Sequence, residues 1–107
     1  MREIKFRAFD KKTGHMDYEL ATTTCLGHDR ISELMQFTGL LDKNAQEIYE
    51  HDIMSDPEND GRKYHITWNG AEYRWGAWDR GFERVFSDMH NAMVIGNVHE
   101  NPELLKN

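Results

Sequence analysis

The chain has 107 residues, 38% of them hydrophobic, with 3 Trp, 4 Tyr and 5 Phe, which fits one domain with a modest core and excludes an unfolded composition. Both halves share the formal net charge of −6, because residues 1–53 carry 7 basic and 10 acidic groups and residues 54–107 carry 6 and 9. A non-specific DNA binder needs a positive surface, so this balance argues against one.

Two strands are predicted near the start of the chain. Over residues 3–9, apolar and charged side chains alternate with the two-residue period of a half-buried strand. Asp10 and Gly14 then favour a short turn, because Asp suits its first position and Gly accepts positive φ. A second strand is therefore expected over residues 15–20.

The middle of the chain carries weaker signals. Residues 21–29 fit either a strand end or an irregular loop. With Asp29 as a cap, residues 30–36 are expected to begin as a short turn of helix before the chain extends over residues 35–38. Residues 55–63 are polar and rich in turn formers, which predicts a surface loop.

A β-hairpin over residues 64–75 is the clearest local prediction. Asn69 and Gly70 both tolerate the left-handed conformation that a two-residue type I′ turn requires. With this turn, Trp68 would face Ala71 across the hairpin. One face would then carry Tyr64, Ile66, Trp68, Tyr73 and Trp75.

The remaining elements are short. Apolar spacing in residues 76–91 fits a helix, but Gly76 and Gly81 interrupt it, and a short strand fits as well. A strand is expected over residues 93–98 and a helical turn over residues 101–105. The whole pattern predicts a mostly β (α+β) fold, built of short-stranded antiparallel sheets with short helical pieces.

Three segments frame the chain and together resemble the YopX-like family of bacteriophage and prophage proteins. They are Arg2–Asp10, Leu34–Ile53 and Val94–Leu105. The resemblance implies a single domain over residues 1–107. Within it, an N-terminal hairpin and connecting segment (1–46) would precede a small Src-homology-3-like barrel and a terminal helical turn (47–107). The family offers no catalytic residues to carry over.

This sequence departs from the family pattern at two turns. His51 stands where glycine is usual, and Ala45 follows Asn44 where the family usually has Asn-Gly. Glycine at both places suits turns with positive φ, which other residues adopt at a cost. The resemblance therefore leaves the backbone geometry at Ala45 and His51 open.

Candidate chemistry is sparse. Cys25 has no obvious base beside it, and no pair of histidines has the i, i+4 spacing of a helical zinc site, so we expect no metal and no cofactor. His51 and Asp52, beside Glu50, form either an acid–base group or a turn histidine with a carboxylate bonded to local backbone. The six histidines are His15, His28, His51, His65, His90 and His99.

An aromatic and arginine series over residues 73–84 is the more informative candidate. Such a series either stacks single-stranded nucleic acid or anchors a protein interface. The structural alternative places Tyr73 and Trp75 in the core, and we expect this for both. At the N-terminus, Lys5 and Arg7 point the same way and form either a solvated outer face or a phosphate-binding patch. The possible interaction surface comprises Trp78, Phe82, Arg74, Arg80, Lys5 and Arg7.

The resemblance implies a phage or prophage accessory protein, and together with these observations we expect one that is not an enzyme and binds a host or phage protein. One alternative is a nucleic-acid-associated regulator, acting by direct binding or as an acidic competitor of a DNA-binding protein. Another is a small hydrolase around His51 and Asp52. Without a membrane-spanning run or a signal peptide, and with a single cysteine, we expect a cytoplasmic location in a bacterial host cell and no membrane partner. Homo-oligomer formation stays open.

Overall fold

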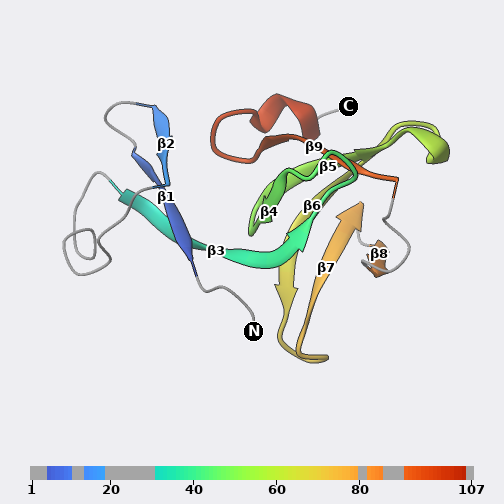
Figure 1. Ribbon diagram of the computed structural model, residues 1–107, viewed down its shortest axis with the longest axis horizontal. Coiled ribbons are helices and arrows are strands. Elements are labelled where there is room, and N and C mark those ends of the chain that lie inside the picture. Colours follow the sequence, from blue (N-terminus) through green and yellow to red (C-terminus); the bar gives the residue numbers. More distant parts are fainter. Residues whose placement is uncertain (1–4, 11–13, 19–30, 80–81, 86–90, 106–107) are drawn as a thin grey trace.

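Two antiparallel β-sheets make up the computed structural model, which describes residues 5–10, 14–18, 31–79, 82–85 and 91–105 (Figure 1). The four-stranded sheet has the order β2-β1-β3-β4 and the five-stranded sheet the order β8-β7-β6-β5-β9. The fold is mostly antiparallel β, as the sequence predicted. None of the helices in these residues has the length and hydrophobicity to cross a membrane.

The four-stranded sheet is organised around one long strand. β3 pairs with β1 at its start and with β4 near its end, and Figure 1 shows it running between the N-terminal hairpin and the second sheet. A helical turn over residues 30–36 was expected, but the chain is already extended at Ile31 because pairing with β1 begins there. The strands are β1 (Phe6–Asp10), β2 (His15–Asp17), β3 (Ile31–Leu41) and β4 (Glu47–Tyr49).

The five-stranded sheet is a meander closed by the last strand. β5 to β8 pair in succession, and β9 returns to pair with the free edge of β5. This is the part of the chain for which the resemblance implied a small Src-homology-3-like barrel. Residues 76–91 therefore include a short strand, one of the two predicted alternatives. The strands are β5 (Asp52–Asp56), β6 (Arg62–Asn69), β7 (Arg74–Asp79), β8 (Phe82–Val85) and β9 (Met93–Asn97).

One contact shows how strongly this sheet curls. Arg84 on β8 forms an ion pair with Asp56 on β5, and its guanidinium lies 5.8 Å from the centre of the Tyr64 ring. Two strands, β6 and β7, separate β8 from β5, so a flat sheet would hold their backbones about 14 Å apart. The five strands therefore curve into half a barrel, with Arg84 and Asp56 meeting across its concave side.

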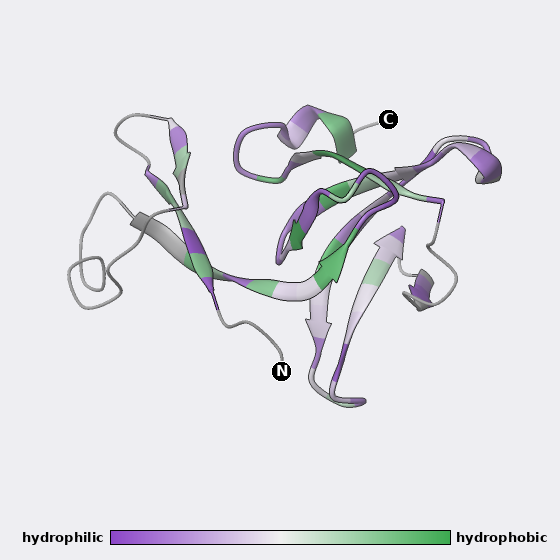
Figure 2. Ribbon diagram, viewed as in Figure 1, coloured by the Kyte–Doolittle hydropathy of each residue, from purple (hydrophilic) through white to green (hydrophobic). Residues whose placement is uncertain are grey.

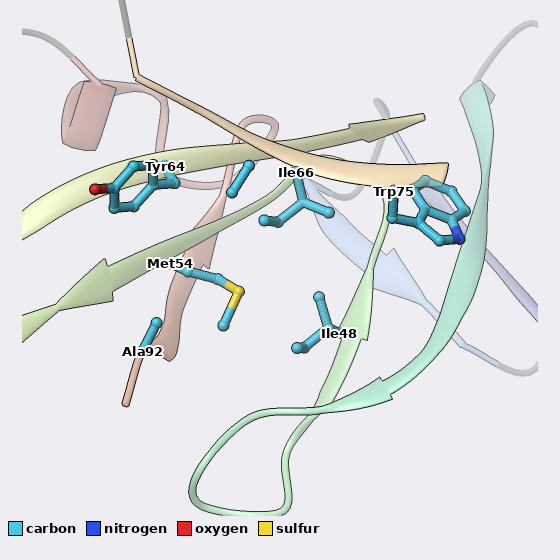
Figure 3. Close-up of a cluster of buried hydrophobic side chains, with 7 residues drawn as sticks. Ile48, Met54, Tyr64, Ile66, Trp75 and Ala92 are labelled. Carbon is cyan, nitrogen blue, oxygen red and sulfur yellow. The ribbon is translucent and has the colours of Figure 1, made fainter. Parts of the chain in front are cut away.

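The concave side holds the main apolar core. Ile66 and Met54 are almost completely buried there, and Ile48 enters the same cluster from β4 of the other sheet. Figure 3 shows Ile48 lying between Met54 and Trp75. The predicted division of the domain into residues 1–46 and 47–107 separates β3 from β4, although these two strands pair with each other. The cluster comprises Ile48, Met54, Tyr64, Ile66, Trp75, Ala77 and Ala92.

Short 3-10 helices mark two turns. The predicted loop at residues 55–63 is shorter than expected, since only residues 57–61 lie between β5 and β6. η1 (Pro57–Asn59) begins there with Asp56 accepting a hydrogen bond from the Glu58 amide at 3.0 Å. Figure 2 shows this turn as a hydrophilic end of the sheet.

The helical turn predicted at residues 101–105 is confirmed as η3 (Pro102–Leu105). It lies close against β9 at Gly96, where a Cβ would come within 2.9 Å of Leu104 Cδ1 and 2.5 Å of Asn101 Oδ1. A side chain at this position would have to displace the side chains of Asn101 and Leu104, so glycine permits the close packing of η3 on the strand.

Candidate interaction surface

The β6–β7 hairpin ends in a loop of four residues, Gly70–Tyr73, and projects away from the other strands in Figure 1. The Asn69 side chain builds this loop, because its Oδ1 accepts hydrogen bonds from the amides of Ala71 and Glu72, both at 3.1 Å. Tyr73 closes the loop in the left-handed conformation, with φ of 53°.

The hairpin was predicted correctly, but its register was wrong by four residues. Trp68 pairs with Trp75 rather than with Ala71, and Gly70 has no positive φ, so no type I′ turn forms. The side chain of Asn69 caps a wider loop and replaces the tight turn. Because a shift of four preserves the two-residue alternation, the predicted inward direction of Trp75 still holds.

Aromatic side chains at this hairpin have very different exposures. Trp75 is 8% exposed and joins the core, whereas Trp68 is 45% exposed and Tyr73 is 82% exposed. Trp68 packs edge-on against Trp75, with ring centroids 5.2 Å apart. The expectation of a buried Tyr73 is wrong, because this residue lies in the loop and not in a strand.

A polar network holds the base of the hairpin. Arg74 Nη2 contacts Glu83 Oε1 on β8 at 2.6 Å, and its Nε donates to Glu72 Oε2 at 3.0 Å. Asn69 Nδ2 donates to the same Glu83 carboxylate at 3.1 and 3.2 Å. Hydrogen bonding to Glu72, and then to Glu83, raises the pKa of the Arg74 guanidinium. The cation of Arg74 is therefore paired with one carboxylate of the hairpin loop and one of β8.

Gly76 makes room for the carboxylate of this network. A Cβ on Gly76 would lie 2.9 Å from Glu83 Cδ and still closer to Glu83 Oε2. The Glu83 side chain thus passes directly over the glycine on its way to Asn69 and Arg74. Gly76, which interrupts the helical pattern in the sequence, therefore leaves the space that the Glu83 side chain occupies on the sheet.

The other residues of the predicted surface do not join the hairpin tip. Trp78 is half-buried on β7, where it pairs with His65 of β6. Arg80 and the side chain of Phe82 lie outside the described residues. Lys5 forms an ion pair with Glu47 and lies 5.0 Å from the centre of the Phe37 ring. The predicted interaction surface did not include Trp68. Its place directly before the turn residues Asn69 and Gly70 is the sequence signal for a position at the end of the hairpin.

Arg7 corrects the prediction of an exposed N-terminal charged face. Its residue exposure is 1%, and its Nη2 forms an ion pair with Asp52 Oδ1 at 2.8 Å and donates to the Glu50 carbonyl at 3.0 Å. The guanidinium also lies 4.8 Å from the centre of the Tyr49 ring, in cation–π geometry. Arg7 therefore contributes to the interior and cannot contact a phosphate or a partner.

Asp52 is held by protein groups at both of its carboxylate oxygens. Its Oδ2 accepts a hydrogen bond from the Tyr49 amide at 2.8 Å, which was one of its two predicted roles. Burial raises the pKa of the Asp52 carboxyl, while Arg7 and the Tyr49 amide oppose that rise. Oδ1 is thus occupied by Arg7 and Oδ2 by the Tyr49 amide.

Three of the scattered histidines come together. His51 Nδ1 and His65 Nε2 are 2.7 Å apart, and the His99 ring is perpendicular to His51 with centroids 6.2 Å apart. Across the ranges the structure covers, no three His, Cys, Asp or Glu side chains are arranged to hold a metal ion. Their assembly could not be read from spacing because each lies on a different segment.

Both turns that depart from the usual glycines retain positive φ. Ala45 has φ of 63° and His51 has φ of 68°. The turn at Ala45 is supported by Asp42, whose Oδ1 accepts from the amides of Asn44 and Gln46 at 2.8 and 2.9 Å. Both turns therefore keep the left-handed conformation even though neither has glycine, the residue that adopts it most easily.

Comparisons with known proteins agree with this architecture. The family described as "YopX protein" matches residues 17–106. The fold is similar to the crystal structure of protein EF1440 from Enterococcus faecalis, with a TM-score of 0.72 and 25% identity over 99% of this chain and 100% of that one. A search of curated proteins finds no significant match. With 17–106 matched, the chain belongs to the YopX family.

Proposed function

We propose that this chain is a phage or prophage accessory protein that binds another protein in the bacterial cytoplasm and catalyses no reaction. Its contact surface would be the hairpin tip, defined as Trp68, Gly70–Tyr73 and the outer part of Arg74. The observation that carries the proposal is the exposure of Trp68 and Tyr73, 45% and 82%, on a projecting loop.

Exposed aromatic side chains of this kind favour a protein partner. Trp, Tyr and Arg are enriched among the residues that contribute most to binding energy at protein interfaces. Trp68 is already oriented by its contact with Trp75, whereas Tyr73 has its backbone fixed by the left-handed end of the loop. Trp68 therefore has less side-chain freedom to lose on binding, which supports affinity.

Charge at the tip supports a protein over a nucleic acid. Arg74 is paired with Glu72 and Glu83, so the tip offers no free cation to a phosphate. At the N-terminus, Arg7 is buried and Lys5 is paired with Glu47. Lys5, Arg7 and Arg74, which would contact phosphates in direct nucleic-acid binding, are therefore buried or paired with carboxylates. Nucleic-acid binding remains as an outcome of the test.

The test is a pull-down from host-type bacterial lysate, with and without nuclease, using three forms of the tagged protein. They are the wild type, Tyr73→Asn and Leu41→Ser. Asparagine tolerates positive φ, so Tyr73→Asn removes the ring while keeping the loop. Leu41 is 56% exposed on β3 and serves as the matched control for loss of an exposed apolar side chain.

A stoichiometric protein that survives nuclease, is retained by Leu41→Ser and is lost from Tyr73→Asn would support the proposal. A partner bound equally by all three forms would exclude the hairpin tip as its contact surface. Recovery only without nuclease would replace the protein partner by nucleic acid.

A further inference from the structure

Three imidazole rings meet where the two sheets join. His51 lies in the turn between β4 and β5, His65 on β6, and His99 just after β9. His51 and His65 are joined by a 2.7 Å contact between Nδ1 and Nε2, with ring centroids 4.9 Å apart. His99 stacks on Phe9 of β1 at 5.1 Å, so the cluster touches the N-terminal sheet as well.

The short contact between two imidazoles limits how many protons they can hold. One nitrogen must donate its proton and the other must accept with a lone pair. If both rings are protonated, both facing nitrogens carry hydrogen, and the bond is replaced by repulsion between two cations. The observed geometry therefore fits at most one proton charge on the pair.

The backbone at His51 links this pair to its surroundings. The His51 amide donates to the Ile66 carbonyl at 2.7 Å, and the Val98 amide donates to the His51 carbonyl at 3.0 Å. His51 also holds φ of 68°, a left-handed conformation that is unfavourable for a residue other than glycine. The contact with His65 offsets part of that cost, so losing it favours rearrangement of the turn.

A carboxylate lies beside the histidine pair. Glu50 Oε2 lies 3.9 Å from His51 Nε2, on the side of the ring opposite His65. The next carboxylate, Asp52, is already paired with Arg7. The ionisable groups on the elements around the cluster are Asp10 and Arg7 of β1, Glu50 of the β4–β5 turn, Asp52 of β5, Lys63 and Arg62 of β6, Asp79 of β7, and Glu100 and Glu103 near η3.

We propose that His51, His65 and His99 form a proton-sensitive joint, closed while the His51–His65 pair is neutral or carries one positive charge and loosened when both rings are cationic. The joint connects the β4–β5 turn, β6 and the segment after β9. It does not depend on the hairpin tip, and its readout is independent of any partner.

Hydrogen exchange of the full chain tests the joint directly. The amides of His51 and Val98 are monitored between about pH 8 and about pH 5, the range in which histidine changes charge, after correction for intrinsic exchange rates. We expect protection of these two amides to fall about tenfold on acidification while protection in the centre of β6 and β7 is kept. Equal protection at both pH values would overturn the proposal.

A variant pair separates the joint from general acid effects. Glutamine at position 65 keeps a hydrogen-bonding side chain that does not titrate, so His65→Gln should lose the pH dependence of the Val98 amide. His15→Gln, at an exposed position on β2, should keep it. Retention of the full pH dependence in His65→Gln, or its loss in His15→Gln, would overturn the assignment to this pair.

Discussion

The two sheets are built of similar antiparallel strands, yet different interactions hold their centres. In the five-stranded sheet, Ile66 and Met54 lie in an apolar cluster on the concave side. In the four-stranded sheet, the largest of the fully buried side chains is Arg7, which is paired with Asp52 and lies over the Tyr49 ring. Alternation along a strand identifies its two faces, but it does not tell which polar face will be covered.

The difference matters because the two centres respond differently to substitution. An apolar core loses stability in proportion to the volume removed. A buried ion pair adds little net stability compared with an apolar replacement, but removing one partner leaves an uncompensated charge. The N-terminal sheet should therefore tolerate a double substitution better than a single one.

The largest effect is expected from Arg7→Met, which leaves the Asp52 carboxylate buried without its cation. The free energy of unfolding should fall by about 3–5 kcal/mol, measured by urea denaturation at neutral pH. Asp52→Asn added to this variant removes the charge and keeps an acceptor for the Tyr49 amide. Stability should then recover in part, and a double variant less stable than Arg7→Met would contradict the ionic account.

A core substitution in the other sheet gives the contrasting case. Ile66 is 0% exposed, and Ile66→Ala should lower the free energy of unfolding by about 3 kcal/mol through lost burial and a residual cavity. Combined with Arg7→Met, the two losses should add, because Arg7 packs against Asp52 and Tyr49 whereas Ile66 lies in the apolar cluster of the other sheet. If the loss in free energy of unfolding of the double variant differed strongly from the sum of the two single losses, the two centres would be energetically coupled.

The smallest expected effect sharpens the comparison at a turn. Ala45 has φ of 63°, so Ala45→Gly relieves the left-handed strain, while glycine adds freedom to the unfolded chain. The balance should raise the free energy of unfolding by about 0.5 kcal/mol. Thermal unfolding would register it as a small increase in Tm, and a decrease would show that the alanine methyl makes a stabilising contact.

Much of the fold could be predicted because alternating apolar and polar residues indicate strands and turn-forming residues indicate the turns between them. The strands at residues 64–75 and 93–98 and the turn at residues 101–105 were anticipated in this way. The hairpin register was not, since Asn69 followed by Gly70 suits a two-residue turn as well as a side-chain-capped loop. Local sequence does not distinguish these two outcomes.

The interaction surface was less predictable for a different reason. Exposure of Tyr73 follows from the loop length, and burial of Arg7 follows from Asp52, which is far away in the sequence. Neither fact is contained in a short window of residues. The histidine cluster is a similar case, because three separate segments bring His51, His65 and His99 together.

The strand order has a consequence for synthesis. β5 pairs on one side with β6, which follows it directly, and on the other with β9, which the ribosome makes only after β7 and β8. A nascent chain that has formed the β5–β8 meander still exposes the outer edge of β5. Open edges of this kind recruit strands from other chains. Until β9 pairs with it, the outer edge of β5 is therefore the place on this sheet where a strand of another chain can add.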